Sequence, residues 1–147
     1  MISIRQAVPG DEKAIFYLIK ELALFEKAPE QVTNTASQLA KDLFEDCICE
    51  AIVSELNNEI VGFALYYTSY STWKGRCLYL EDFYVKEEHR NKGIGSLLFD
   101  KVVQIAKEKG VKRMDWQVLE WNKTAIDFYT ARKAILDPEW INGRYFF

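Results

Sequence analysis

The sequence predicts an α/β (α+β) protein in which a mixed, mostly antiparallel sheet is covered by helices on both faces. Two observations support this. Three strand-like segments follow one another as hairpins in the middle of the 147-residue chain, and a long helical pattern separates them from the next strand-like segment. Hairpins give antiparallel pairs, whereas a helical crossover joins parallel strands, so both orientations are expected in one sheet. Because no repeat or linker interrupts the chain, residues 1–147 are interpreted as a single domain.

The first third of the chain predicts one strand and two helices. Residues 2–5 are a short strand candidate, and Pro9-Gly10-Asp11 then breaks the pattern, with Asp11 placed to cap a helix. This helix is expected to end near Glu26, because apolar residues recur at helical spacing: Ile15, Leu18, Ile19, Leu22 and Phe25. A second helix is expected over residues 37–44.

The middle of the chain predicts a three-stranded meander. The strand candidates are residues 49–56, 60–70 and 76–86. Asn57-Asn58 and Lys74-Gly75 separate them, and these residue types favour tight hairpin turns.

The last third of the chain predicts two helices and two strands. Apolar residues at helical spacing follow two glycines and stop at Gly110, where lysines in the last turn and a glycine indicate a helix end. A strand over residues 111–119, a short helix over 122–132 and a final strand over 143–147 are expected to follow.

The composition indicates a soluble globular protein without a nucleic-acid or membrane partner. The net charge is −3 and the isoelectric point about 5.3, which disfavours binding to polyanions. The N-terminus lacks the apolar run of a signal peptide, and no segment reaches about 18 consecutive apolar residues. Three cysteines without a paired framework favour a reducing compartment, so a cytoplasmic location is expected.

No metal site is expected. The chain has one histidine, and Cys47 and Cys49 lack the spacing of metal ligands. These two cysteines and Cys77 are interpreted as small core residues in strands. The histidine, His89, is interpreted as a solvated neighbour of the glycine-rich loop rather than as a base.

The loop HRNKGIG, just before the long helix, predicts an anion site. Gly93 and Gly95 let the backbone approach a ligand closely at a helix N-terminus, where N–H groups lack partners. The residue order excludes a P-loop. A dinucleotide fingerprint needs a third glycine where Leu98 stands, although Asp115 follows at about the distance of a ribose-binding acid. A turn that merely starts a helix is the remaining alternative.

The pattern Arg90-x-x-Gly93-x-Gly95, preceded by LYLEDFYV, resembles the acetyl-CoA loop of the GNAT superfamily of N-acetyltransferases. Further segments resemble one subfamily, the diamine (spermidine/spermine N1-) acetyltransferases and their thialysine-acetylating relatives: LIKELALFE, IVGFALYYTSYSTWKG, EWNKTAIDFY and RYFF. The resemblance covers nearly the whole chain. It implies a GNAT fold, with the sheet splayed at the cofactor cleft between LYLEDFYV and VKRMDWQV.

The resemblance also implies an activity, the movement of an acetyl group from acetyl-CoA to a primary amine of a small cationic substrate. Polyamines, diamines, thialysine and lysine-like amino acids are the candidates. Since no cysteine matches an acyl-enzyme position, direct attack in a ternary complex is expected. A homodimer is expected as well. A coenzyme A-binding sensor or scaffold without turnover, and an enzyme that acetylates a protein amine, are the alternatives.

The family roles can be carried over residue by residue. The positions that match contacts to acetyl-CoA are Phe83, Tyr84, Val85, Arg90, Asn91, Lys92, Gly93, Ile94, Gly95, Ser96, Asn122, Ala125 and Tyr129. Tyr129 matches the tyrosine that protonates the leaving thiolate, and a backbone N–H near Val85 would face the developing oxyanion. After Tyr129 the family has a glycine before Ala134, where this chain has Lys133.

The amine site is implied at two acids and their neighbours. The positions that match substrate contacts are Phe25, Glu26, Glu81, Asp115, Trp116, Gln117 and Glu139. Glu81 also matches the residue that relays the amine proton. Successive residues of a strand alternate faces, so Glu81 and Asp82 are expected on opposite faces unless a bulge intervenes, with Asp82 in a structural hydrogen bond.

Overall fold

The computed structural model describes residues 1–147, which form two compact parts, residues 1–116 and residues 117–147. The first part contains the whole sheet. Its elements in chain order are β1 (Ile2–Gln6), α1 (Glu12–Phe25), α2 (Ala36–Ala40), β2 (Glu50–Leu56), β3 (Glu59–Ser71), β4 (Gly75–Val85), α3 (Ile94–Glu108) and β5 (Met114–Asp115). Short 3-10 turns occur at Pro29–Gln31 and Glu87–His89, and a π-helical turn, Lys41–Glu45, extends α2. The second part contains one helix, α4 (Lys123–Ala131).

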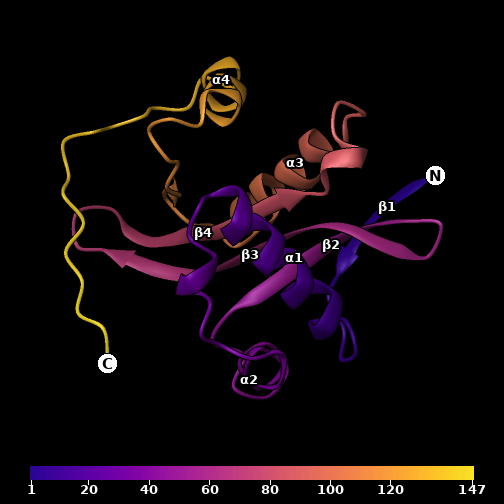
Figure 1. Cartoon of the computed structure of the whole chain (residues 1–147). Helices are drawn as coiled ribbons and strands as arrows, with labels where there is room; N and C mark the ends of the chain where they lie inside the picture. The colour runs from indigo at the N-terminus through magenta and orange to yellow at the C-terminus, as the bar shows by residue number, and fades with distance from the viewer. The chain divides into compact units, whose positions relative to one another are not determined.

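The sheet order is β1-β2-β3-β4-β5. The first four strands are antiparallel neighbours, and β5 runs parallel to β4. Helices α1 and α2 lie over one face of this sheet and α3 over the other (Figure 1). The predicted mixed, mostly antiparallel sheet with helices on both faces is therefore confirmed.

Strict alternation along the strands builds the core on the α1 face. Val53 of β2 and Phe63 of β3 are fully buried there against Ile15 and Leu18 of α1. The intervening residues of the same strands, such as Ile52, point to the α3 face and are also buried. Burial on both faces explains why the central strands read as nearly continuous apolar runs.

The predicted turns have the expected backbone. Asn57 and Asn58 both adopt positive φ, 52° and 64°, as a two-residue hairpin turn of type I′ requires. Gly75, at φ 96°, turns β3 into β4. The meander prediction is confirmed to within one residue at most strand ends.

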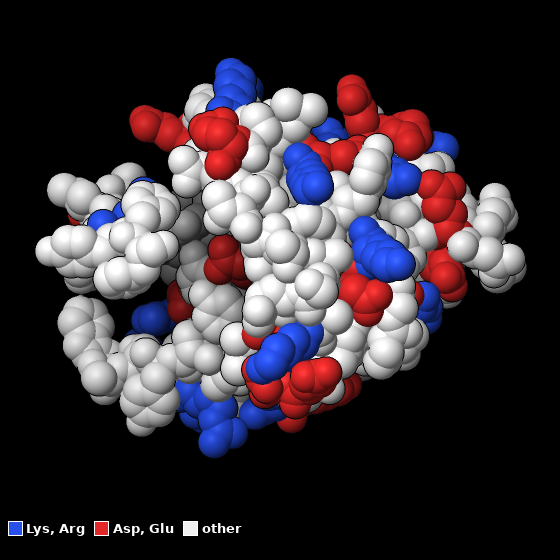
Figure 2. Space-filling model, turned by 60° about the horizontal axis from the view of Figure 1, so that its bottom comes forward, with Lys and Arg blue, Asp and Glu red and all other residues white.

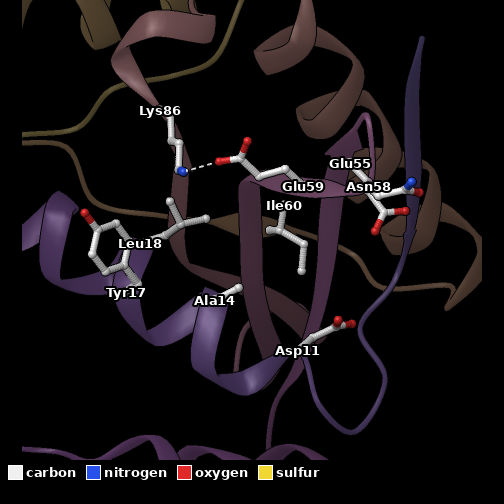
Figure 3. Close-up of a pocket in the computed structure, with 9 residues that line it drawn as sticks. All are labelled: Asp11, Ala14, Tyr17, Leu18, Glu55, Asn58, Glu59, Ile60 and Lys86. Atoms are coloured by element: carbon white, nitrogen blue, oxygen red, sulfur yellow. Dashed lines mark hydrogen bonds and ion pairs between the residues drawn. The ribbon is translucent and has the colours of Figure 1, made fainter.

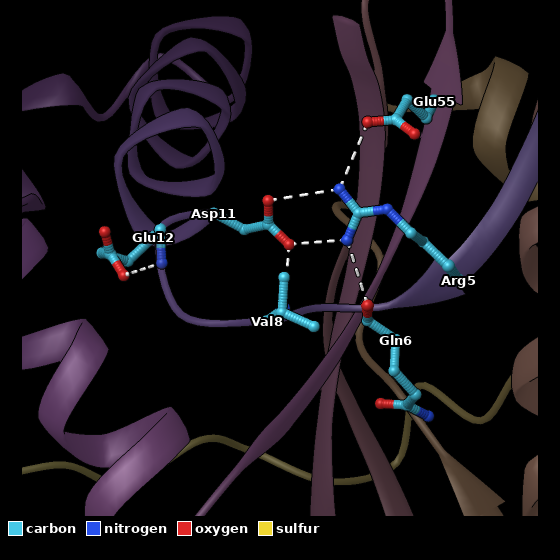
Figure 4. Close-up of polar contacts among 7 residues, drawn as sticks. Arg5, Gln6, Val8, Asp11, Glu12 and Glu55 are labelled. Atoms are coloured by element: carbon cyan, nitrogen blue, oxygen red, sulfur yellow. Dashed lines mark hydrogen bonds and ion pairs between the residues drawn. The ribbon is translucent and has the colours of Figure 1, made fainter. Parts of the chain in front are cut away.

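Asp11 stands at the N-cap of α1 but caps no helical N–H. Its carboxylate instead accepts from Arg5 Nη1 at 2.7 Å and from the Val8 N–H at 2.8 Å, while Arg5 Nη2 reaches Glu55 at 3.2 Å (Figure 4). The Arg5 hydrogen bond holds the pKa of Asp11 below its usual value. Asp11 thus connects the end of β1 to the start of α1 through these hydrogen bonds, and it does not cap the helix as predicted.

Two predicted strands are wrong in extent or existence. The strand expected over 111–119 is reduced to Met114–Asp115, because only these residues pair with β4 and an unpaired backbone forms no ladder. The strand expected over 143–147 does not form. These residues are exposed, and no neighbouring strand supplies partners for their backbone groups.

The second part is held by local contacts. Asn122 Oδ1 accepts from the Ala125 N–H at 3.2 Å and caps α4, as predicted. Gln117 Nε2 donates to Asn142 Oδ1 at 2.7 Å, which joins the beginning and the end of this part.

Charges of both signs are interspersed over the face shown in Figure 2.

No helix of the structure combines the length and the apolar character that crossing a bilayer requires. Among the cysteines, Cys77 is buried in β4 as predicted. Cys47 and Cys49 lie before β2, outside the strands, and are exposed and half-buried, so the prediction is wrong for these two.

Candidate active site

The glycine-rich loop folds into the N-terminus of α3. Gly93 is the N-cap residue in the left-handed conformation, at φ 80°, and it brings no side chain to cap the helix. Asn91 is also left-handed, at φ 61°. The first N–H groups of α3 therefore lack intrahelical acceptors and stay available for an anion, as the sequence predicts.

The two glycines keep the approach to this helix end open. A Cβ on Gly93 would meet no heavy atom within 4 Å, so the space beyond it is free. A Cβ on Gly95 would lie 3.7 Å from Phe83 Cζ, an ordinary contact. Gly93 is thus the glycine whose left-handed conformation the loop requires and which leaves space for a ligand. Gly95 instead packs against Phe83 of β4.

Arg90 links the loop to the sheet and to α1. Its Nε donates to the Val85 carbonyl at 2.9 Å, and its guanidinium lies 5.3 Å from the Phe25 ring and 5.1 Å from the Tyr84 ring. A predicted cofactor contact and a predicted substrate contact, Arg90 and Phe25, are therefore neighbours. His89, predicted to be solvated, instead buries its Nδ1 without a hydrogen-bond partner.

Strand β4 has no neighbouring strand along part of its outer side, where the cofactor was predicted. Strand β5 pairs only with Leu78 and Tyr79, so residues 80–85 have no strand neighbour on that side. This is the splay expected between LYLEDFYV and VKRMDWQV.

A β-bulge interrupts β4 at Glu81. Tyr66 pairs with Leu80 and the preceding residue, Leu65, pairs with Asp82, which leaves Glu81 as the extra residue. Directly opposite residues of antiparallel strands share a face. Because Leu65 belongs to the core beneath α1, Asp82 faces α1 as well.

Glu81 lies on this same face. Its Oε1 accepts a hydrogen bond from Tyr67 Oη at 3.2 Å, and Tyr67 stacks on its cross-strand partner Tyr79. Tyr67 is two residues from Leu65 along β3 and therefore shares its face. The bulge thus brings Glu81 and Asp82 to one side of the sheet, the exception that the sequence left open.

A third carboxylate completes the group. Glu26 is the C-cap residue of α1, and burial together with the charge of Glu81 raises its pKa. Burial, followed by the charges of Glu81 and Glu26, raises the pKa of Asp82 to about 7. No ion pair of the structure includes any of the three. We call Glu26, Glu81 and Asp82 the acidic face.

Two tyrosines border the acidic face. Burial raises the pKa of Tyr67 to about 12, with Glu81 adding to the effect, so this phenol stays protonated and donates. Tyr79 pairs in register with Asp115 of β5, and parallel partners share a face, so Asp115 lies on the same side. Arg113 neutralises Asp115 at 2.8 Å. Trp116 points the other way, edge-on to Phe99 of α3 at 5.5 Å.

The remaining predicted residues belong to the second part. Tyr129 lies in α4, with its ring edge-on to Phe128 at 5.5 Å. Asn122 and Ala125 form the cap of the same helix. Gln117 and Glu139 lie outside regular structure. Their roles stay predictions.

Known proteins match this chain closely. A profile of the Acetyltransferase (GNAT) family matches residues 16–133. Thialysine N-epsilon-acetyltransferase of Bos taurus is 44% identical over 142 residues, which cover 90% of this chain and 84% of that protein. The chain belongs to the acetyltransferase (GNAT) family. It is an enzyme that transfers acetyl groups.

Two further similarities extend this result. Spermidine/spermine N(1)-acetyltransferase-like protein 1 of Homo sapiens is 38% identical to this acetyltransferase over 140 residues, covering 90% of the chain and 20% of that protein. An aminoglycoside acetyltransferase from an uncultured soil metagenomic sample, in complex with trehalose, superposes with a TM-score of 0.81 at 22% identity, covering 99% of this chain and 96% of that one. The latter similarity shows the fold, which is the predicted GNAT fold.

The pocket found in the first part of this acetyltransferase lies elsewhere. It has a volume of about 390 Å³ and opens between α1 and the β2–β3 hairpin (Figure 3). Its lining residues are Asp11, Ala14, Tyr17, Leu18, Glu55, Asn58, Glu59, Ile60 and Lys86. None is a predicted site residue, and its charges are paired, Asp11 and Glu55 with Arg5 and Glu59 with Lys86. It therefore offers a ligand little polar recognition.

Sequence reasoning missed three residues of the acidic face and its border. Asp82 was assigned a structural hydrogen bond, but no side-chain hydrogen bond or ion pair of the structure includes its carboxylate. Tyr67 and Tyr79 were not singled out. The signal that could have found all three is the bulge: if Glu81 is the extra residue, Asp82 and Tyr79 share its face, as does Tyr67, the partner of Tyr79 in β3.

Proposed function

We propose that this acetyltransferase moves the acetyl group of acetyl-CoA to a primary amine of a small cationic substrate, a polyamine, a diamine, thialysine or a lysine-like amino acid. The acidic face carries this proposal. Its carboxylates have no ion-pair partner, and those of Glu26 and Asp82 are partly buried, which favours a cationic ligand because their desolvation is costly unless a cation compensates it. The names of the relatives, thialysine N-epsilon-acetyltransferase and spermidine/spermine N(1)-acetyltransferase-like protein 1, support the same substrate class.

The N-terminus of α3 and the open edge of β4 fit acetyl-CoA. Gly93, left-handed and with free space beyond it, supports a pyrophosphate held by the N–H groups of Asn91, Lys92, Gly93, Ile94, Gly95 and Ser96. Phe83, Tyr84 and Val85 lie where β4 has no neighbouring strand on its outer side, and the pantetheine arm would run along this side. When bound, acetyl-CoA supplies an activated acyl group with a thiolate as its leaving group.

The protein side chains then move protons. Glu26 and Phe25, at the end of α1, hold a distal ammonium, and Glu81 receives a proton from the reacting nitrogen directly or through water. Tyr129 donates a proton to the leaving sulfur. Attack is direct, in a ternary complex, because no cysteine matches an acyl-enzyme position.

We further propose that the enzyme is a cytoplasmic homodimer. Large aromatic side chains are exposed, among them Trp73, Trp140 and Phe146, and such residues are enriched at interfaces between subunits. Sedimentation equilibrium tests this directly, and a monomeric mass at micromolar concentration would contradict it.

The release of free thiol from acetyl-CoA tests the proposed function. The panel contains a diamine, thialysine, lysine, a neutral-tailed monoamine, an N-terminal peptide and a control without amine. We expect release with the diamine and the two amino acids, and a slower reaction with the monoamine. Binding of acetyl-CoA without release for any amine would favour the sensor or scaffold. Release with the peptide alone would favour a protein substrate.

A further inference from the structure

The acidic face contains a carboxylate for which the proposed function gives no task. Asp82 faces α1 because of the bulge at Glu81, its side chain is partly buried, and no side-chain hydrogen bond or ion pair involves its carboxylate. Burying part of a carboxylate without a partner costs free energy that a purely structural role does not recover.

We propose that Asp82 is the final acceptor of the proton that the bound ammonium loses, with Glu81 passing the proton to it from the substrate. This inference rests on the proposed function, since it concerns the same amine site. Asp82 does not contact the substrate in this scheme and acts through Glu81.

The environment gives Asp82 a basicity that an ordinary carboxylate lacks. An alkyl ammonium has a pKa of about 10, so transferring its proton to a carboxylate near pKa 4 is unfavourable by about 10⁶-fold. With a pKa of about 7, Asp82 accepts the same proton at a cost of about 10³-fold. Glu81, which is exposed and hydrogen-bonded to Tyr67, is suited to transfer rather than to storage.

The charged and titratable groups around Asp82 agree with this role. Glu26 faces it from α1 and Glu81 adjoins it in β4, and both charges make its protonated form more favourable. Tyr67 of β3 and Tyr79 of β4 remain neutral phenols on the same face, because burial and the acids raise their pKa values. Asp115 of β5 is already paired with Arg113.

The protons balance across the reaction. The ammonium gives one proton through Glu81 to the Asp82 carboxylate, which becomes a neutral carboxylic acid. The free amine then forms the new C–N bond as the C–S bond breaks, and the second proton of nitrogen replaces the one that Tyr129 gives to sulfur. Asp82 returns its proton to solvent before the next turnover.

The pH dependence of kcat/KM distinguishes Asp82 from Glu81. We would measure it for a diamine by thiol release with the wild type, Asp82→Asn, Glu81→Gln and a control of equal charge change, Asp46→Asn, at an exposed surface site. The wild type should lose kcat/KM as the pH falls through about 7. In Asp82→Asn this limb should disappear, with kcat/KM at neutral pH lowered on the order of 10²-fold.

Glu81→Gln gives a different signature. Without the Glu81 carboxylate only water can carry the proton, so kcat/KM at neutral pH should also fall, and the remaining limb should move to lower pH because the charge of Glu81 helps to raise the pKa of Asp82. Asp46→Asn should superimpose on the wild type. A limb near neutral pH that persists in Asp82→Asn would overturn the inference while leaving the proposed function intact. A wild type without thiol release would overturn the proposed function itself.

A second measurement tests the inference without the Asp82→Asn variant, in case that variant does not fold. Carbon-13 NMR of the wild-type carboxyl groups, with Glu81→Gln for comparison, should show one aspartate that titrates near pH 7 and moves to lower pH in the variant. Titration of every aspartate near its ordinary value of about 4 would contradict the inference.

Discussion

The burial of Asp82 has a consequence for the stability of the enzyme. A carboxylate whose pKa is raised in the folded state binds a proton more tightly there than in the unfolded chain. Its contribution to stability is therefore full below about pH 4 and is lost as the pH rises through about 7. Asp82 thus makes the fold less stable at the pH at which its basicity is useful.

Asp82→Asn should remove this dependence. The variant should match the wild type in free energy of unfolding near pH 4 and exceed it at pH 8, by about 4 kcal/mol at most, since one pKa unit corresponds to about 1.4 kcal/mol. Urea titrations at the two pH values measure the difference, in which the other carboxylates cancel. A difference that does not change with pH would show that Asp82 has the same pKa in the folded and unfolded states, and would contradict the raised pKa.

Tyr129 is the residue on which the leaving-group step depends. Tyr129→Phe should lower kcat on the order of 10²-fold, the lower range for an acid or base, while the KM for acetyl-CoA changes little. Steady-state thiol release with a good amine measures both constants. If kcat stayed within a factor of about three, either Tyr129 is not the acid or chemistry does not limit turnover.

At the scale of elements, the start of α3 depends on one glycine. Gly93→Val should abolish acetyl-CoA binding, because it places a branched side chain at the anion site and strains a left-handed residue at φ 80°. Gly110→Val, at φ 70° just after the C-terminal end of the same helix, carries similar strain far from the loop and is the control. Calorimetric titration should show binding by the control alone. Normal binding by a folded Gly93→Val would refute the anion site.

The end of α4 lacks the glycine that its geometry favours. Lys133 is left-handed, at φ 64°, and its N–H bonds to the Thr130 carbonyl while that of Ala134 bonds to the Tyr129 carbonyl. Gly110 makes the equivalent bonds at the end of α3. The glycine expected here from the family is therefore a helix-ending residue.

Lys133→Gly should stabilise α4 by about 1 kcal/mol, since a left-handed residue with a Cβ costs roughly that amount. Hydrogen exchange of the α4 amides measures the local effect, and Lys133→Ala, which keeps the Cβ, should show no such gain. Equal protection in all three proteins would contradict the assignment.

The sequence predicts the local elements well because turn residues and periodicity are local properties. Asn57-Asn58, Asn122 and Gly110 all act as their types suggest. The prediction fails for strands, which form only where another strand supplies hydrogen-bond partners. The strand at 111–119 shortens because β4 and β5 diverge, and the strand at 143–147 does not form because nothing pairs with it.

The same distinction holds for the site. The glycine loop is found from the sequence because backbone conformation suffices to define it. The acidic face is found only in part, because the side to which Asp82 points depends on a single bulge in the β3–β4 register. Asp11 caps no helix because Arg5, six residues earlier, competes for its carboxylate.

At the scale of the whole molecule, the account joins an anion-binding helix end to an acid-lined amine site across the sheet edge at β4. A net charge of −3 favours cationic substrates over anionic ones, but the recognition is local. Glu26 is the acid assigned to a distal ammonium, so a substrate with two cationic groups should depend on it and a neutral-tailed monoamine should not.

The KM of Glu26→Gln for a diamine and for a neutral-tailed monoamine is the most direct test of this claim. We expect the diamine KM to rise by roughly tenfold, the effect of one charge-assisted contact of about 1.5 kcal/mol, and the monoamine KM to stay unchanged. Glu30→Gln, at an exposed position shortly after α1, should leave both values unchanged. Equal KM values for the diamine in Glu26→Gln and wild type would contradict the claim that these carboxylates select the substrate.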